Sequence, residues 1–572
     1  MEVNLEKSSS SDTAGQAQSL ADLKIKQSSI FSPKLLLTLN ADLIEAFVNT
    51  SRSRWFQLLG MMRYSSGFMA PFWSILRNFY NGGQNISNDG SSWGKSLDFI
   101  KLLLFEVQLT AKGAWADMSA ISRYHLHEMS DMLTAIENTL LEKKDEDLVR
   151  YSERQLRLMD TVVNAYPEAV REVESEYGFH LDTDGYVKVA ETDRFELYQV
   201  LPTDKKIKVR DHGKPVMIIP PYVLGANILA FLPGENRSYV HAFANHGIPT
   251  YIRLVKDINK NPAVQLMRGE DDVLDTRYFC EKLLERNGRP VTLNGYCQGG
   301  FMAVLGILSG ELDGLVDALT TCVAPMDGSR SKGLVEYIEH LPYRFRNLGY
   351  ATKVLPNGNR VVDGKVMSWV YKLKSIQKES PLFTFYRDIG MFEAGAQKVP
   401  RINKVAAAIS HWLTYDITNI PVEITRLSFE SYTKPVAGDG TLPVMLFGRS
   451  LNFKRLKEKG IKWLICIAEK DELVEEASAL APLNYVDAEV TRFPKGHTSI
   501  AVSWSSPAAE CALHMNYDKA PCGTDNSRGP VRFQLDLEEE QSPKHTFQGA
   551  PSEPRKQSKP GSRARRPAGP NS

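Results

Sequence analysis

The segment that most constrains the fold is PVTLNGYCQGGFMAVLGILSG, residues 290–310, in which a cysteine stands close to several glycines. The residues before the cysteine form a short apolar run that is typical of a buried parallel strand. The residues after it form an apolar run of helical length. Gly295 and Gly299 lack a Cβ atom, so the strand end and the helix start can approach closely around Cys297. The segment therefore predicts a buried strand, a tight turn at Cys297 and an apolar helix.

Other short apolar runs alternate with helical segments in the same part of the chain, and a helix is expected at about 270–287. Strands that alternate with helices indicate a parallel α/β sheet. A strand, a G-x-nucleophile-x-G turn and a helix in this order form the nucleophile elbow of the α/β-hydrolase fold. We therefore expect an α/β-hydrolase fold with a cap insertion at about 326–440. The predicted strands are 194–201, 215–223, 248–255, 290–296, 319–325, 462–469 and 488–494.

We place this catalytic domain at 181–515. The chain on either side of it differs in composition and in hydrophobic periodicity. Residues 1–30 are rich in Ser, Lys and Gln and are predicted to be disordered, as is the tail 516–572, which ends in a basic stretch. Residues 31–180 show long helical periodicity and predict an all-helical N-terminal region. Its apolar stretch 64–76 is too short to span a bilayer of about 30 Å, and we interpret it as a core helix or an interfacial segment.

The charges of the chain nearly cancel, with 69 Lys and Arg against 68 Asp and Glu and a net charge of +1. This balance provides no electrostatic footprint for nucleic acid, so none is expected as a partner. The polar N-terminus lacks the apolar core of a secretory signal, and we expect a cytoplasmic protein with free thiols. The six cysteines form no C-x-x-C pair. His125 and His127 would point about 200° apart on a helix, so we expect neither a metal nor a bound cofactor.

A cysteine nucleophile needs a base, and the base needs an acid that orients it. In the α/β-hydrolase fold these residues follow the order nucleophile, acid, histidine. We predict Cys297 as the nucleophile, Asp471 after a strand as the acid, and His497 in the loop after the next strand as the general base. The backbone N–H of Gln298, at the helix start, is the predicted oxyanion donor. The alternative for Cys297 is a purely structural turn residue. Three further cysteines in apolar runs are expected to pack in the core: Cys280, Cys322 and Cys466.

The same region resembles the polyhydroxyalkanoate synthases, of which the poly-3-hydroxybutyrate synthases are an example. These are α/β-hydrolase-fold acyltransferases with a Cys-His-Asp triad. The resemblance covers about 190–505. It is carried by GYCQGG (295–300), ETDRFELYQVLPT (191–203), PVMIIPPYVLGANILAFLPGENRSYVHAFANHGI (215–248), DGKVMSWVYKL (363–373) and HWLTYDITNIP (411–421).

This resemblance implies that Cys297 takes a 3-hydroxyacyl group from a coenzyme A thioester, and that His497 deprotonates it while Asp471 orients or assists His497. The backbone amides of Gln298 and Val223 would hold the oxyanion. Coenzyme A thioester would be a substrate rather than a bound cofactor. The resemblance also implies a polyester product, a homodimer, and a cytoplasmic location at polyester granules.

Two other functions stay open at this point. One is a hydrolase, either an acyl thioesterase or a polyester depolymerase, which would use the same triad with water as the acceptor. The other is a non-catalytic protein at the surface of storage granules, bound through the helical N-terminal region. Where the family usually has Trp after the third strand and His after the acid, this chain has Arg253 and Glu472. Five aromatic residues of the insertion would shield an acyl channel or form the core of the cap: Trp369, Phe383, Phe385, Tyr386 and Trp412.

Overall fold

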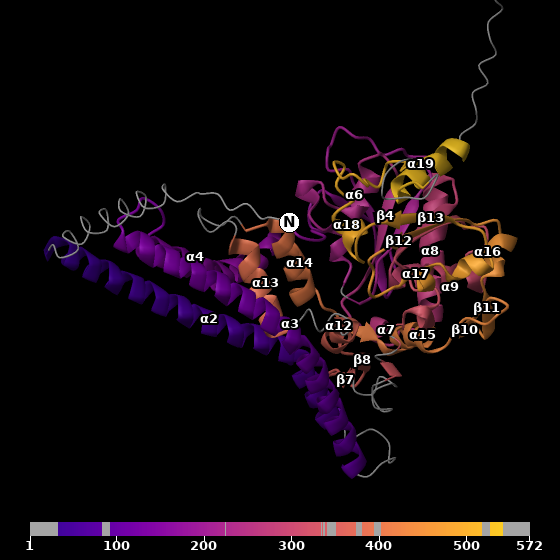
Figure 1. Cartoon of the computed structure of the whole chain (residues 1–572). Helices are drawn as coiled ribbons and strands as arrows, with labels where there is room; N and C mark the ends of the chain where they lie inside the picture. The colour runs from indigo at the N-terminus through magenta and orange to yellow at the C-terminus, as the bar shows by residue number, and fades with distance from the viewer. Residues whose placement is uncertain are drawn as a thin grey trace, which may run out of the picture.

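The computed structural model describes residues 33–82, 92–223, 225–332, 335, 338–339, 351–372, 380–393, 402–517 and 527–541. Within them the largest sheet has eight strands in the order β1-β2-β4-β3-β5-β6-β12-β13 (Figure 1). The first two strands run antiparallel to their neighbours, and the other six run parallel to one another. The strands are β1 Tyr186–Glu191, β2 Phe195–Val200, β3 Val216–Ile219, β4 Thr250–Val255, β5 Val291–Tyr296, β6 Val316–Cys322, β12 Lys462–Ala468 and β13 Glu489–Phe493.

The central strands are buried on both faces, which explains why their sequences are continuous apolar runs. In β3, Met217 and Ile219 belong to one apolar cluster, whereas Val216 and Ile218 belong to another. Successive side chains of a strand point to opposite faces of the sheet, so the two clusters lie on its two sides. Helices α8 (Gly269–Asn287) and α9 (Gln298–Ser309) contribute to the first cluster. Helices α6 (Tyr239–Ala244), α18 (Ser499–Val502) and α19 (Pro530–Gln541) contribute to the second.

This three-layer arrangement, with the nucleophile-elbow turn between β5 and α9, is the α/β-hydrolase fold, as the sequence predicts. The predicted strands and the predicted helix at 270–287 are present within a few residues of their expected bounds. One strand of the sheet was not predicted: β1 lies at an edge, and none of its side chains is fully buried. The sequence of an edge strand carries no apolar run that would identify it.

Between β6 and β12 the chain leaves the large sheet and forms the inserted elements (Figure 1). A small three-stranded sheet in the order β7-β8-β9 precedes helix α15, and a hairpin of β10 and β11 follows it. The inserted elements are β7 Thr352–Val354, β8 Arg360–Val362, α12 Gly364–Lys372, α13 Pro381–Glu393, α14 Lys404–Tyr415, β9 Ile420–Pro421, α15 Val422–Thr433, β10 Thr441–Leu446, β11 Arg449–Asn452 and α16 Lys454–Glu458.

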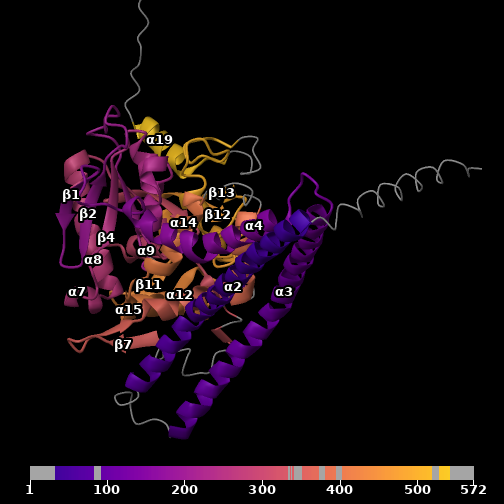
Figure 2. The same ribbon diagram turned by 90° about the vertical axis from the view of Figure 1, so that its left-hand side faces the viewer.

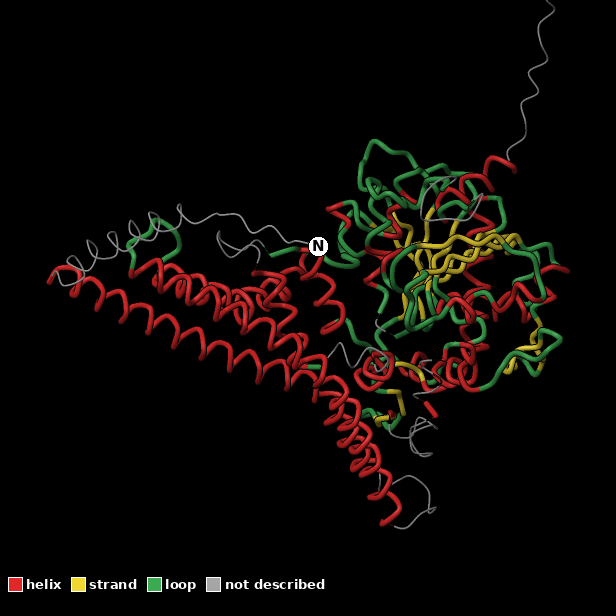
Figure 3. Tube along the Cα trace, in the orientation of Figure 1, coloured by secondary structure: helices red, strands yellow, loops and turns green. Residues whose placement is uncertain are grey.

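The N-terminal region is a layer of long helices that extends beyond the hydrolase domain (Figure 2). Helix α2 (Pro33–Gly82) packs on α4 (Leu148–Asp160), and α13 of the insertion packs on α2 and α3 (Ser92–Leu140). A π-turn at Thr161–Ala165 follows α4, and helix α5 (Tyr166–Glu172) restarts with Pro167 in its first turn. The described part of this region holds helices and loops but no strand (Figure 3). None of the helices among the described residues is both long and apolar enough to cross a membrane.

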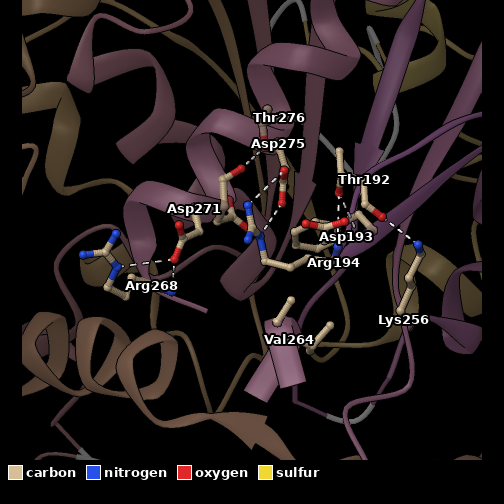
Figure 4. Close-up of polar contacts among 12 residues, drawn as sticks. Thr192, Asp193, Arg194, Lys256, Val264, Arg268, Asp271, Asp275 and Thr276 are labelled. Carbon is tan, nitrogen blue, oxygen red and sulfur yellow. Dashed lines mark hydrogen bonds and ion pairs between the residues drawn. The ribbon is translucent and has the colours of Figure 1, made fainter. Parts of the chain in front are cut away.

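Ion pairs and hydrogen bonds tie the antiparallel edge of the large sheet to α8 (Figure 4). Arg194, just before β2, donates from Nε and Nη2 to the two carboxylate oxygens of Asp275 at 2.7 and 3.3 Å. Lys256 donates from Nζ to the backbone oxygen of Thr192 at 2.6 Å. The first turn of α8 is capped by Asp271, whose carboxylate accepts the backbone N–H of Arg268 at 2.9 Å. These contacts fix the edge that β1 and β2 form.

The tail differs from its prediction. Disorder was expected from 516 onward, and this is wrong at 516–517 and over 527–541, where the chain is described and forms α19. The helix is ordered because its apolar side is buried on the sheet, with Val531, Phe533 and Leu537 in the second apolar cluster. The remainder of the tail and residues 1–30 lie outside the described residues.

The expectation that all thiols are free is also wrong at one position. Cys511 is disulfide-bonded, and its partner lies outside the described residues. Cys280, Cys297, Cys322 and Cys466 are free.

Candidate active site

The turn that carries Cys297 has a strained backbone. Its φ is 52° and its ψ is −124°, a combination that residues with a Cβ rarely adopt. A Cβ on Gly299 would overlap the carbonyl oxygens of Ile219 and Pro220, and a Cβ on Gly295 would overlap the backbone of Gly300. The glycines of the pattern are therefore required by close backbone approach. Because β5 and α9 are held in this way, Cys297 is presented at the carboxyl edge of the sheet.

His497 and Asp471 lie at the same edge of the sheet, in the loops that follow β13 and β12. Their side chains are joined by a hydrogen bond of 2.6 Å between His497 Nδ1 and Asp471 Oδ2. The other carboxylate oxygen of Asp471 accepts the backbone N–H groups of Leu473 and Val474, each at 2.9 Å. The Tyr296 hydroxyl donates to the backbone oxygen of His497 at 2.8 Å. The acid and the histidine loop are thus both held in place.

The three predicted residues come together in the structure. His497 is hydrogen-bonded to Asp471, and it lines the same cavity as Cys297. Burial lowers the pKa of His497, but the neighbouring charges of Asp471 and of the Cys297 thiolate raise it well above its usual value of 6.5. The Asp471 side chain is 1% exposed and that of His497 is 18% exposed. An imidazole between a buried carboxylate and a thiol can accept the thiol proton and hold it as an ion pair.

A small cavity of ≈60 Å³ opens over the sulfur. Gln298 lies at the first position of α9, where the backbone N–H has no acceptor within the helix. Val223, the second predicted oxyanion residue, lines the same cavity. The lining also includes residues of α14, α15 and the loops: Pro221, Ile228, Pro325, Trp412, Ser428, Tyr432, Leu473 and Thr498. The cavity is therefore mainly apolar, with a few polar side chains in its lining.

The described aromatic residues of the insertion divide between the two predicted roles, shielding the site and packing in an apolar core. Trp412 lines the cavity, as expected for a residue that shields it. Phe385 and Tyr386 instead belong to the apolar cluster between α13 and the N-terminal helices. Phe383 is half-buried on the same helix. The side chain of Trp369 lies outside the described residues.

Sequence reasoning missed two groups around the site. The first is the contact of the Gln298 side chain, whose Nε2 donates to the Ser428 hydroxyl of α15 at 2.5 Å. Nothing in the local sequence of α15 indicates this contact. It joins the insertion to the residue that follows the nucleophile.

The second missed group is a buried ion pair beneath the oxyanion loop. Arg253 of β4 and Asp272 of α8 are 2.9 Å apart and almost completely buried. Tyr222 precedes Val223 in the chain, and its hydroxyl donates to the same carboxylate of Asp272. The guanidinium also lies 4.3 Å from the centre of the Phe195 ring. A single arginine inside the apolar run IPTYIRLV was the sequence signal that this strand faces a buried acid.

The other predicted cysteines and histidines lie outside the site. Cys280, Cys322 and Cys466 are buried in the core, as expected. His125 contacts the Tyr386 hydroxyl at 3.0 Å, whereas His127 faces Asp131 at 3.8 Å. Among the residues that the structure describes, no group of three or more His, Cys, Asp or Glu side chains is placed to hold a metal ion.

Comparisons with known proteins extend only to solved structures. No family model matches the chain, and no curated protein matches it. A carboxylesterase of Nitrososphaera gargenis is 14% identical, with a TM-score of 0.31, over 55% of this chain and 92% of that chain. The carboxylesterase CesB of Bacillus subtilis is 11% identical, with a TM-score of 0.29, over 59% and 92%. A 2-hydroxy-6-oxo-6-phenylhexa-2,4-dienoate hydrolase of Rhodococcus sp. strain RHA1 is 12% identical, with a TM-score of 0.30, over 56% and 94%. These neighbours are hydrolases, and at such identities and TM-scores no conclusion about this chain rests on them.

Proposed function

We propose that the protein is an acyltransferase of the polyhydroxyalkanoate synthase type, which moves 3-hydroxyacyl groups from coenzyme A to Cys297 and then to the hydroxyl end of a polyester. The observation that carries the proposal is a cysteine on the nucleophile elbow that shares one apolar cavity with the hydrogen-bonded His497–Asp471 pair, under the insertion. The resemblance over 190–505 supports the choice of substrate class.

The first half-reaction acylates the cysteine. His497 takes the thiol proton, and the thiolate of Cys297 attacks the carbonyl carbon of the coenzyme A thioester. The amides of Gln298 and Val223 stabilise the oxyanion that forms. The carbon–sulfur bond to coenzyme A then breaks, and coenzyme A leaves as a thiol with the proton from His497. One thioester is exchanged for another, so this step has little thermodynamic cost.

The second half-reaction forms the ester. The hydroxyl group of another hydroxyacyl unit loses its proton to His497 and attacks the acyl carbon on Cys297. The sulfur of Cys297 leaves and regains a proton from His497. The apolar lining around Trp412 and Leu473 keeps water from this acyl-enzyme, which favours transfer over hydrolysis.

The test is incubation with 3-hydroxybutyryl-coenzyme A, followed by intact-mass measurement and product analysis. An acyl adduct that maps to Cys297, with free coenzyme A and growing turbidity, supports the polymerase. An adduct with free hydroxy acid and no polymer identifies a thioesterase. The Cys297→Ala variant is the control that should form no adduct.

The non-catalytic alternative predicts no adduct and no release of coenzyme A in either variant. The same alternative requires that Cys297→Ala leave every measurable property of the protein intact. The acyltransferase proposal also includes two partners, a second copy of the chain and the surface of polyester granules. Sedimentation of the purified protein tests the homodimer, and recovery of the protein with the polymer product tests the granule surface.

A further inference from the structure

The outer face of α2 is apolar over most of its length. All but one of its described large apolar side chains that are exposed recur at spacings of three, four and seven residues or their sums, and they lie within about 60° of one line along the helix. The exception is Leu43, at about 100° from that line. Phe47 is 72% exposed and Ile44 is 66% exposed. We call these residues the α2 stripe: Ile44, Phe47, Val48, Trp55, Leu58, Met62 and Trp73.

Helix α3 has a matching feature. All but one of its described large apolar side chains that are exposed also lie within about 60° of one line over more than forty residues. The exception is Met132, at about 80°. Trp115 is 80% exposed and Leu126 is 62% exposed. We call these residues the α3 stripe: Leu97, Ile100, Leu104, Trp115, Met118, Leu126, Met129, Leu133 and Leu140.

The opposite faces of both helices, which are turned into the helical layer, carry polar residues. Ser53, Gln57 and Asn78 are buried on α2, and Glu128 and Asn138 are buried on α3. They are satisfied inside the layer: Gln57 donates to the Tyr386 hydroxyl at 3.0 Å, for example. A helix in water normally buries its apolar side and exposes its polar side. Here the inner side already holds an apolar cluster together with these polar residues, and the outer stripes are apolar as well, so an apolar medium is the natural neighbour of the outer faces.

The charges beside the stripes indicate which medium this is. Exposed cations flank the stripes at about 60° to 100° from their centres, with Arg52, Arg54 and Arg77 on α2 and Lys101 and Arg123 on α3. Glu128 and Asp131 lie on the inner face of α3. Two exposed acids also lie beside the stripes: Glu45 of α2, at about 100°, and Glu137 of α3, which is paired with Lys143 at 2.7 Å. Cations on both flanks fit the anionic headgroups of a lipid surface.

The straight course of the stripes along the helices favours a lipid surface over a second copy of the chain as the partner. A strict seven-residue repeat drifts by about 20° per heptad on a straight helix and imposes a supercoil. Both stripes instead keep to one line, which suits a flat surface. Cations beside both stripes would also face one another in a symmetric pairing of either helix with its copy.

We propose that the α2 and α3 stripes lie on the surface of an anionic phospholipid layer, parallel to it. The helices do not cross it, since none of the described helices has the apolar length that spanning requires. Helices α12 and α13 of the insertion pack on the inner side of α2. The lipid surface would therefore hold the insertion, and the hydrolase domain with it, in a fixed orientation (Figure 2).

The test is co-sedimentation of the full chain with vesicles of phosphatidylcholine alone or with about one third phosphatidylglycerol. We expect at least about tenfold stronger binding to the anionic vesicles, weakened by added salt. The variant Phe47→Ser/Trp115→Ser/Leu126→Ser should lose this binding by about tenfold or more. The matched control, Leu266→Ser/Val354→Ser/Met445→Ser, removes three exposed apolar side chains elsewhere and should bind as the wild type does.

Substitutions of the flanking cations test whether the lipid surface that the stripes contact is anionic. Arg52→Gln/Arg77→Gln/Lys101→Gln should weaken binding to anionic vesicles by about fivefold per residue and leave binding to neutral vesicles unchanged. Its control is Lys205→Gln/Lys260→Gln/Lys457→Gln, three exposed lysines of the hydrolase domain. The measurement requires no enzymatic activity, so it stands whatever the catalytic assay gives.

Three outcomes would overturn the proposal. The first is a wild-type chain that binds no vesicle, or binds equally well after the stripe substitutions. The second is a dimer in light scattering that the stripe substitutions convert to a monomer, which would identify a second copy as the partner. The third is binding to bare polyester particles with no binding to phospholipid.

Discussion

In the hydrolase domain the central strands are buried on both faces, and the reactive groups sit at one rim of the sheet. In the layer of α2, α3 and α4 much of the arrangement is reversed, because Gln57, Glu128 and Arg154 are buried and aromatic residues such as Trp115 face outward. The first region gathers its polar groups at the candidate site. The second holds buried polar groups beside an apolar cluster, and it has an outer surface that water solvates poorly. The burial of a charged residue therefore does not by itself show whether that residue belongs to a functional site or to the packing of a helical layer.

Among substitutions in the two regions, the largest loss of activity is expected at the proposed nucleophile, Cys297. Cys297→Ala should lower the release of coenzyme A by at least about 10³-fold, because no other thiol lies on the elbow. The midpoint of thermal unfolding should change little, since only one sulfur atom is removed from a half-buried turn. Cys280→Ala is the control, a buried cysteine on α8 whose loss should leave the rate within about twofold. A Cys297→Ala variant that keeps the wild-type rate would refute the catalytic assignment.

The next effect concerns the charge that supports His497. Asp471→Asn should lower the rate by about 10²- to 10⁴-fold. It should also lower the pKa of His497, because burial then acts without the carboxylate that raises it. NMR titration of the imidazole protons in both proteins measures this pKa.

The raised pKa of His497 also predicts how the free energy of unfolding depends on pH. Because the folded pKa of His497 is raised above its unfolded value of 6.5, its stabilising contribution is complete below pH 6.5 and is lost as the pH rises through the folded pKa. Urea unfolding of the wild type should show this loss, and Asp471→Asn should not. An equal pH dependence in the two proteins would show that the pair does not form.

A buried ion pair of the hydrolase domain gives the third prediction. Asp272→Asn leaves Arg253 buried without its counter-charge and should reduce the free energy of unfolding by about 3–5 kcal/mol. Urea denaturation measures the change. Asp271→Asn, on the same helix, removes an exposed pair with Arg268 and a cap and should cost only about 1 kcal/mol. Similar losses in the two variants would mean that the Arg253 pair is not buried in solution.

The smallest effect is expected in the helical layer. Burial raises the pKa of Glu128, although Tyr151, Arg154 and Gln155 partly offset this. The folded state therefore holds the proton more tightly than the unfolded state, and stability should fall as the pH rises from 4.5 through the folded pKa. Glu128→Gln removes this dependence and should leave stability at pH 7 unchanged or slightly higher. A loss as large as that of Asp272→Asn would show that the two interiors are alike.

The sequence was sufficient for the sheet because its central strands are apolar runs bounded by turn residues. It was also sufficient to select Cys297, Asp471 and His497, since their order along the chain is restrictive and each follows a strand. The structure brings these three side chains together, and their chemical roles remain the proposal that the acylation test examines. The glycines around the cysteine were correctly interpreted as sites of close backbone approach.

Other features had no local signal. The tail helix α19 is stabilised by tertiary burial of Val531 and Phe533, and its acidic composition masks this. The periodicity of α2 and α3 predicts helices but not which side is covered, because both sides of α2 carry apolar residues. The contact of Gln298 with Ser428 joins segments 130 residues apart, and no sequence pattern encodes that pairing.

The position of the insertion has a consequence for how the protein is made. Cys297 leaves the ribosome with the first half of the sheet, whereas Asp471 and His497 emerge only after the inserted helices and two more strands. During synthesis the sulfur is therefore an ordinary thiol, with no base beside it. Under the proposed mechanism the thiol gains its base only when β12 pairs with β6 and β13 pairs with β12, so the completion of the sheet and the activation of the thiol are a single event.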